Sequence, residues 1–462
     1  MERDSLDFKN MSVGKLFIKQ LIPTLLGMVS SALFIIVDGI FVGQGVGSDA
    51  LAAVNIVAPV SMIAAGLGLM LGMGGAILAS INLSRDKTKI ANINITQSFA
   101  VSTAIATIIT LFILFFPYTT AGLLGANEYL MELAVEYLFW FAMCIPFMVL
   151  SVSLPFFVRL TQPNYAMWCM VLATVINIVL DYIFIFEFGW GLFGAAVATG
   201  IGEVVGVVML LAYLFRSSIT VHFTRLKLSP KSIRLTLRNT VYMLKLGVSS
   251  FLSEATLAVM AITGNYVFMH HLGTDGVAAY SIICYLFPII FMVFNATVQS
   301  VQPIISFNYG CGQIGRSNQA LRMALFVAVG IGLLFFFLSV FFSGNVVSLF
   351  VPDVTNATWG YATAGMPLFA IDFAFFGVNI VAIGYYTSIE KIKRATLLTI
   401  LRGMLPVVFF FSLPLFFGTE GIWISVAVAD IVVTIFIVTL ALKERLRKNG
   451  STDSRHREAL QA

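Results

Sequence analysis

Long apolar runs, separated by short polar segments, follow one another along the whole chain. A helix needs about 18–20 apolar residues to cross roughly 30 Å of hydrocarbon. About twelve runs are long enough, at residues 14–42, 50–80, 94–118, 130–155, 165–188, 191–215, 241–269, 276–306, 320–350, 358–386, 395–417 and 420–442. The runs are continuous rather than alternating, which favours helices over the strands of a membrane barrel. The pattern predicts an all-α polytopic membrane protein with about twelve transmembrane helices.

The composition agrees with this prediction. Hydrophobic residues make up 59% of the 462 residues and charged residues only 11%, whereas soluble domains carry about 25% charged residues. A soluble globule of this size cannot hide so much apolar surface. A soluble enzyme, a nucleic-acid binder and a disordered scaffold are therefore excluded.

The basic residues between the runs fall on one side of the twelve-helix arrangement. They follow the even-numbered runs and include Arg85, Lys87, Lys89, Arg159, Arg216, Arg225, Lys227, Lys231, Arg234, Arg238, Lys245, Arg316, Arg322, Lys391, Lys393, Arg394, Lys443, Arg445, Arg447 and Lys448. The loops on the opposite side contain acids but no Lys or Arg. Because cytoplasmic loops are enriched in Lys and Arg, we expect both termini in the cytoplasm.

The two halves of the chain are similar to each other. At an offset of 226 residues, the segment 47–53 aligns with 273–279, and at 227 Gly191 and Gly194 align with Gly418 and Gly421. An offset held across half the chain indicates an internal repeat. We therefore expect an N-terminal lobe at 1–215, a basic cytoplasmic linker at 216–240, a C-terminal lobe at 241–442 and a cytoplasmic tail at 443–462. Two parallel six-helix lobes with substrate bound between them are typical of secondary transporters.

Six acidic residues lie well inside the predicted helices: Asp38, Asp181, Glu203, Glu254, Asp372 and Asp430. An ionised side chain that faces lipid costs at least about 2.5 kcal/mol, so these acids should face an aqueous cavity or be neutral. Arg402 is the one clear basic residue inside a run and would neutralise one of them; the sequence leaves open which one. The excess of acids favours protons and cationic ligands over anions.

The fifth and sixth runs carry the most specific arrangement of polar residues. Asn177 and Asp181 are four residues apart and therefore share one helical face. A carboxylate beside a carboxamide supplies oxygen ligands for a small cation and hydrogen bonds that hold the acid in place. Thr199 adds a hydroxyl one turn before Glu203. Glu203 and Asp430 are equivalent in the repeat, which also suits a role in helix packing.

Several segments resemble the multidrug and toxic compound extrusion (MATE) family, in its prokaryotic branch. They are 38–43 (DGIFVG), 47–53, 177–186 (NIVLDYIFIF), 191–199 and 302–310 (QPIISFNYG). The resemblance covers essentially the whole chain. It implies that Asp38, Asn177, Asp181 and Thr199 form the cation or proton site of the N-terminal lobe. It also implies that Glu254 and Asp372 match acids used in the C-terminal lobe.

These features predict a secondary active antiporter that exports organic cations in exchange for H⁺ or Na⁺, with Na⁺ bound at Asp38, Asn177, Asp181 and Thr199. We expect no cofactor, no nucleic-acid partner, a monomer in the bilayer, and a location in the cytoplasmic membrane of a prokaryote. The alternative is a flippase for lipid-linked substrates, whose phosphates would require a cavity rich in Arg and Lys. An enzyme is not expected, because the sequence contains neither a paired nucleophile and base nor metal ligands such as HExxH. It also lacks a phosphate-binding GxxxxGK[ST] loop, so we do not expect ATP to drive transport directly.

Overall fold

The computed structural model describes residues 6–126, 128–216, 220–227 and 229–461, and these residues form helices and no strand. The elements are α1 (Val13–Gly45), α2 (Ser48–Ser84), α3 (Thr88–Phe115), α4 (Pro117–Leu123), α5 (Met131–Val158), α6 (Pro163–Tyr182), the π-helix η1 (Ile183–Glu187), α7 (Gly191–Leu214), α8 (Pro230–Gly310), α9 (Ile314–Ser348), α10 (Ala357–Ala370), α11 (Asp372–Ser388), α12 (Ile392–Ser412) and α13 (Pro414–Gln461). The predicted all-α class is confirmed.

The number of membrane spans also agrees with the sequence. Among the described residues, ten helices are long and apolar enough to cross a membrane, and α10 with α11 forms an eleventh span bent by 41°. The 81 residues of α8 would extend about 120 Å as a straight helix, about four times the hydrocarbon thickness. The backbone breaks at Gly273, where φ is 67°, so α8 supplies two spans and the total is twelve.

The start of α8 differs from the sequence prediction. The segment 216–240 was expected as a polar linker, but α8 begins inside it at Pro230. Ser229 caps this helix, because its side chain accepts a hydrogen bond from the backbone N–H of Ser232 at 3.3 Å. Proline is favoured in the first helical turn, where its missing N–H has no intrahelical acceptor. The second half of the expected linker is therefore helical.

Backbone conformation supports the internal repeat. Gly47 and Gly273, which are equivalent at an offset of 226, both have positive φ angles, of 120° and 67°. Gly191 and Gly418, equivalent at 227, each have φ of 57°. L-residues with a side chain rarely adopt such angles, so glycine at these positions allows the chain to turn into the following helix. The similarity between the halves thus extends from sequence to local geometry.

The chain divides into two compact units. Unit 1 comprises Met1–Ala255, Phe287–Ala324 and Gly384–Lys393, and unit 2 comprises Thr256–Leu286, Leu325–Ile383 and Arg394–Ala462. Both units take residues from α8. The division of the chain into lobes at 1–215 and 241–442 stays a prediction.

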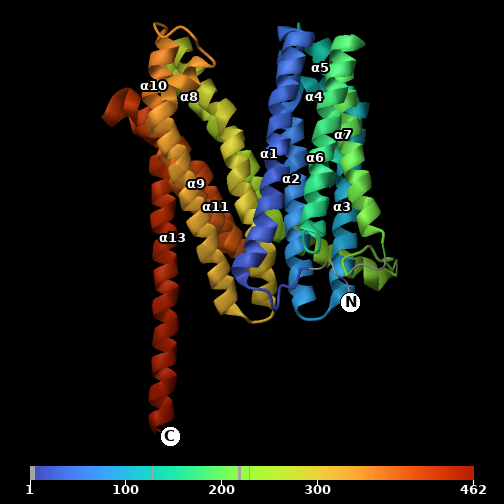
Figure 1. Ribbon diagram of the computed structural model, residues 1–462, viewed down its shortest axis with the longest axis vertical. Helices are drawn as coiled ribbons and strands as arrows, with labels where there is room; N and C mark the ends of the chain where they lie inside the picture. The colour runs from blue at the N-terminus through green and yellow to red at the C-terminus, as the bar shows by residue number, and fades with distance from the viewer. Residues whose placement is uncertain (1–5, 127, 217–219, 228, 462) are drawn as a thin grey trace. The chain divides into compact units, whose positions relative to one another are not determined.

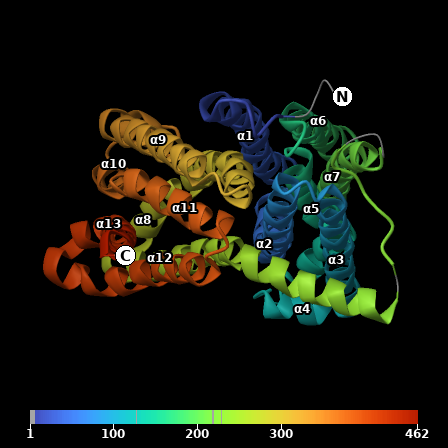
Figure 2. The same cartoon turned by 90° about the horizontal axis from the view of Figure 1, so that it is seen from below.

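In unit 1, α5 is the central helix. It contacts α2, α3, α6 and α7, while α1 packs mainly on α6 (Figures 1 and 2). The first part of α8 packs very closely on α2: a Cβ on Gly247 would lie 1.8 Å from the carbonyl oxygen of Met70, and one on Gly74 would lie 2.2 Å from that of Met243. Glycine is required at both positions because the two backbones touch.

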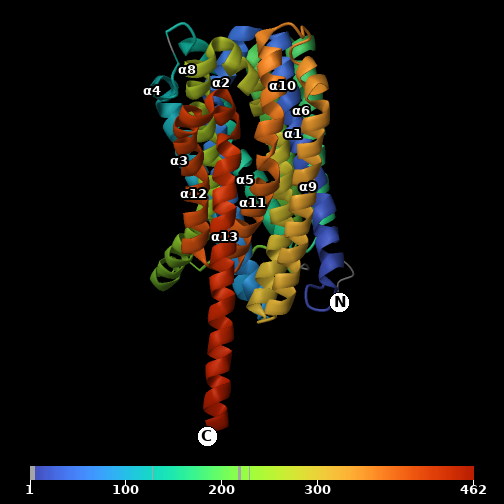
Figure 3. The same ribbon diagram turned by 90° about the vertical axis from the view of Figure 1, so that its left-hand side faces the viewer.

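In unit 2, α9 to α13 pack on one another and on the middle of α8 (Figure 3). Gly332 of α9 lies against the backbone of α11, where an added Cβ would be 2.5 Å from Ala374 Cα. Gly365 of α10 faces the Trp423 ring of α13, which also stacks edge-on against Phe268 of α8. These contacts pack α9 on α11 and α10 on α13, and both α11 and α13 carry polar side chains described below.

Candidate functional site

Three of the predicted site residues come together inside unit 1. Asp38 of α1 is half-buried, whereas Asn177 and Asp181 of α6 are 3% and 0% exposed. The carboxyl groups of Asp38 and Asp181 lie near each other, and the Asn177 amide lies beside Asp181. The two acids therefore face the interior of the helix bundle and each other.

Close packing of α1 on the π-helix η1 brings Asp38 to Asp181. At Gly45 of α1 an added Cβ would lie 2.2 Å from Ile185 Cγ2. The Phe41 ring contacts Phe186 with its centroid at 5.5 Å in an edge-on arrangement. The π-helix begins two residues after Asp181, and such wide turns are found frequently at functional sites.

The neighbouring helix α7 closes the other side of the site. A Cβ on Gly202 would lie 2.8 Å from Asn177 Cβ, so only glycine permits α7 to lie directly on this part of α6. Thr199 lies one turn before this contact and is buried at 5% exposure. All four residues that the sequence predicted for this site are thus on adjoining stretches of α1, α6 and α7.

Tyr137 of α5 is a site residue that the sequence did not indicate. It is 5% exposed, and its phenol lies within electrostatic range of both Asp38 and Asp181. In the sequence, Tyr137 is one aromatic residue among many in an apolar run, so only packing could show that it faces the acids.

The polar atoms of this site fit a small cation or protons. Asp38 Oδ1, both carboxyl oxygens of Asp181 and both polar atoms of the Asn177 amide are buried without a hydrogen-bond partner among the described residues. Buried polar groups are normally hydrogen-bonded, and buried charges are paired. A proton shared between the two carboxyl groups would satisfy part of this demand. Na⁺ would find carboxylate and amide oxygens, the ligands that hard cations prefer.

A second buried polar cluster lies in unit 2 and joins three residues that the sequence singled out separately. Arg402 Nε of α12 lies 3.5 Å from Asp430 Oδ2 of α13, which answers the question of which acid Arg402 neutralises. The Asp372 carboxyl group of α11 lies beside that of Asp430 and near Arg402. One guanidinium thus faces two carboxyl groups, so the cluster carries one excess negative charge when both acids are ionised.

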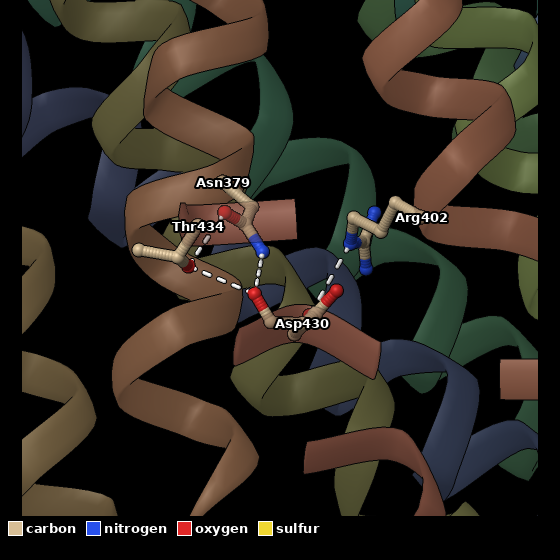
Figure 4. A network of polar contacts seen from close by, with 4 residues as sticks. All are labelled: Asn379, Arg402, Asp430 and Thr434. Atoms are coloured by element: carbon tan, nitrogen blue, oxygen red, sulfur yellow. Dashed lines mark hydrogen bonds and ion pairs between the residues drawn. The ribbon is translucent and has the colours of Figure 1, made fainter. Parts of the chain in front are cut away.

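Hydrogen bonds position this cluster. Asn379 Nδ2 donates to the backbone carbonyl of Asp430 at 2.9 Å, and the Thr434 hydroxyl donates to Asn379 Oδ1 at 2.9 Å (Figure 4). The Arg402 guanidinium lies 4.1 Å from the centroid of the Phe376 ring, a favourable cation–π contact. Asn379, Thr434 and Phe376 had no distinguishing sequence pattern.

The remaining candidates lie apart from these clusters. Glu203 of α7 faces α5, where it lies beside Ser151 and Cys144. Glu254 is half-buried in the part of α8 that belongs to unit 1. It therefore lies in a different unit from Asp372, the other acid that the resemblance assigned to the C-terminal lobe.

Arg159 is one of the basic residues that the sequence places between the apolar runs. It follows α5 directly but is 3% exposed. Its guanidinium donates to Gln299 Oε1 of α8, and its backbone carbonyl accepts from Gln20 Nε2 of α1 at 2.8 Å. Arg402 is therefore not the only buried arginine.

The fold and these buried acids define a polytopic membrane transporter built from two repeated halves. The chain belongs to the MatE family: the MatE family model matches it at residues 23–183 and 233–412. The two matched segments correspond to the two halves of the repeat.

Two curated relatives are similar along nearly their whole length. The multidrug export protein MepA of Staphylococcus aureus (strain MRSA252) is 24% identical over 451 residues, which cover 96% of this chain and 97% of that protein. MepA of Staphylococcus saprophyticus is 25% identical, over 95% of this chain and 96% of that protein. A crystal structure of MATE in complex with MaL6 superposes with a TM-score of 0.88 at 22% identity, covering 98% of this chain and 100% of the other. The chain is a multi-pass membrane transporter and not an enzyme.

Proposed function

We propose that this protein is a multidrug efflux transporter that exports organic cations in exchange for H⁺ or Na⁺. The observation that carries the proposal is the cluster of Asp38, Asn177 and Asp181, with buried oxygens that have no hydrogen-bond partner among the described residues. The names of the curated relatives support export of drugs. The acidic character of the cluster supports cationic substrates and a cationic coupling ion.

The coupling ion acts by changing the charge of the Asp38–Asp181 pair. Two ionised carboxylates at close range repel each other, so a proton or Na⁺ between them stabilises an arrangement in which α1 and α6 lie together. Loss of that ion favours a different arrangement of the helices. A ligand shifts such an equilibrium only as far as its affinities for the two states differ. Exchange therefore requires that the ion and the drug favour opposite states.

The energy available depends on stoichiometry. Exchange of one H⁺ for one monovalent cation moves no net charge, so one pH unit supplies about 1.4 kcal/mol, enough for roughly a tenfold drug gradient. A second ion per drug would add about 2.3 kcal/mol for each 100 mV of membrane potential. No cofactor takes part in this scheme.

The same proposal includes the cellular setting. The basic loops favour cytoplasmic termini in the inner membrane of a prokaryote, and the two-lobe repeat favours a functional monomer. The flippase alternative requires a cavity rich in free Arg and Lys, whereas buried Arg402 pairs with Asp430 and buried Arg159 donates to Gln299.

The test is efflux of a fluorescent organic cation from cells that lack their own exporters. Efflux is followed under an imposed pH gradient and, separately, under a Na⁺ gradient. We expect one gradient to drive efflux in the wild type and Asp38→Asn or Asp181→Asn to reduce the gradient-driven rate at least tenfold. Asp353→Asn, an exposed acid in a loop, serves as the matched control and should pump normally.

Two results would overturn the proposal. If both cluster variants pump like the wild type, the site is assigned wrongly. If neither gradient moves any cation although the protein reaches the membrane, the transported class is wrong.

A further inference from the structure

The first turns of α8 form a segment, residues 230–245, that belongs to unit 1 and packs on it mainly by one face. Gln97 of α3 donates from Nε2 to the Thr236 hydroxyl at 2.9 Å, and Asn239 Nδ2 donates to Gln97 Oε1 at 3.3 Å. Met243 is fully buried against Gly74 of α2. In Figure 2 this segment runs across the ends of the neighbouring helices instead of parallel to them. Its remaining faces are exposed.

One exposed face is purely basic. Lys231, Arg234, Arg238 and Lys245 are all exposed, and at about 100° per residue they fall within an arc of about 60°. We call these four residues the basic face. Among the described residues they make no ion pair with a carboxylate. Glu390 accepts a hydrogen bond from Tyr242 at 2.9 Å, which places one carboxylate beside the segment.

An apolar stripe runs directly beside the basic face. Ile233, Leu237 and Val241 repeat every four residues and are 47%, 62% and 50% exposed. A helix with an apolar stripe beside a row of Lys and Arg lies in the interface of a membrane, with the apolar side chains in the acyl region. The segment leads directly into a membrane span, so its position along the chain agrees with this arrangement.

The internal repeat does not require the two arginines of the basic face, although Lys245 corresponds to Lys19. At an offset of 226 residues, Arg234 and Arg238 correspond to Phe8 and Ser12. The two arginines are therefore specific to the second half of the chain.

We propose that the basic face binds the anionic headgroups of phospholipids in the leaflet nearest to this segment of α8, with Ile233, Leu237 and Val241 inserted among the acyl chains. Charge complementarity supports this occupant: clusters of Lys and Arg beside a transmembrane helix attract anionic lipid, at about 1 kcal/mol per residue. A soluble anion would use the basic face but not the apolar stripe.

The test measures lipid binding to the full-length protein, purified in detergent and stripped of native lipid. Phosphatidylglycerol, phosphatidylcholine, glycerol 1-phosphate and inorganic phosphate are titrated separately, and bound lipid is counted by native mass spectrometry. We expect phosphatidylglycerol to bind in preference to phosphatidylcholine. The variant Arg234→Gln/Arg238→Gln should weaken phosphatidylglycerol binding about 25-fold, or about fivefold per charge removed.

The control Lys87→Gln/Lys89→Gln removes the same charge from the start of α3, where both side chains are exposed, and it should bind lipid like the wild type. Unchanged binding in the arginine variant overturns the proposal, as does an equal loss in both variants, because general charge would then explain the effect. Binding of inorganic phosphate or glycerol 1-phosphate as tight as that of phosphatidylglycerol also overturns it, since the ligand would then be a soluble anion. Equal thermal midpoints of the variants show that folding is unaffected.

Discussion

Replacement of Arg402 by methionine tests the buried cluster of unit 2. The side chains of Arg402 and Asp430 are 7% and 2% exposed and lie 3.5 Å apart. Methionine keeps much of the length of the arginine side chain and its contact with Phe376, but it removes the only basic group of the cluster. Asp372 and Asp430 then face each other without a counter-charge.

The magnitude follows from the distance and the burial. Coulomb's law at 3.5 Å gives about 5 kcal/mol for an effective dielectric constant of about 20. Removing one partner of a buried ion pair generally costs 3–5 kcal/mol, because the other charge is left uncompensated. We therefore expect Arg402→Met to lower the free energy of unfolding by about 3–5 kcal/mol. Asp372→Asn should leave it nearly unchanged, because Arg402 keeps Asp430 as its partner.

The measurement is unfolding of the purified protein in a denaturing detergent titration, followed by tryptophan fluorescence. Arg394→Met is the matched control: Arg394 is also on α12 and pairs with Glu444, but the two side chains are 37% and 31% exposed. Partly exposed pairs contribute about 0–1 kcal/mol, so this variant should be nearly as stable as the wild type. The reasoning is refuted if Arg402→Met is no less stable than Arg394→Met, or if Asp372→Asn is as damaging as Arg402→Met.

Three further predictions concern unit 1. Gly202→Leu forces a side chain into the contact between α6 and α7, so it should lower the free energy of unfolding by about 1–3 kcal/mol and reduce ion-coupled efflux. Efflux at wild-type rates would contradict the assigned packing. Arg159→Met leaves the buried Gln299 oxygen without its donor and should cost about 1–3 kcal/mol in the same detergent titration, while a neutral effect would show that this hydrogen bond is replaced. Hydrogen bonds from the side chain and backbone of Asn10 hold the pKa of Asp7, which precedes α1, below its ordinary value of 3.8. The stability that Asp7 contributes is thus complete above that value and lost as pH falls below it, so the difference in thermal midpoint between wild type and Asp7→Asn should shrink from pH 6 to pH 3.

Much of the fold could be predicted because hydrocarbon imposes a simple rule. A spanning segment must satisfy all its backbone hydrogen bonds internally and present about 20 apolar residues, and both requirements are visible in sequence. Helix breaks were harder. The break at Gly273 falls between the predicted runs 241–269 and 276–306, but the bend between α10 and α11 and the start of α8 at Pro230 lie within patterns that also fit a straight span or a loop.

The candidate site was predicted in part. Asn177 and Asp181 share a helical face by their spacing alone, whereas Asp38 was included through the resemblance to a family. Tyr137 could not be predicted, because an aromatic residue in an apolar run has the same pattern whether it faces lipid or an acid. The position of Glu203 beside α5 was equally invisible.

The sequence alone determined that this chain spans a membrane about twelve times, repeats itself and keeps acids in its interior. These properties depend on local hydrophobicity and on residue type, which every segment carries by itself. Only the tertiary structure decided which acids meet: Asp38 with Asp181, and Asp372 with Asp430 beside Arg402. Such pairs join helices far apart in the chain, and their approach depends on where glycines such as Gly45 and Gly202 let backbones come close.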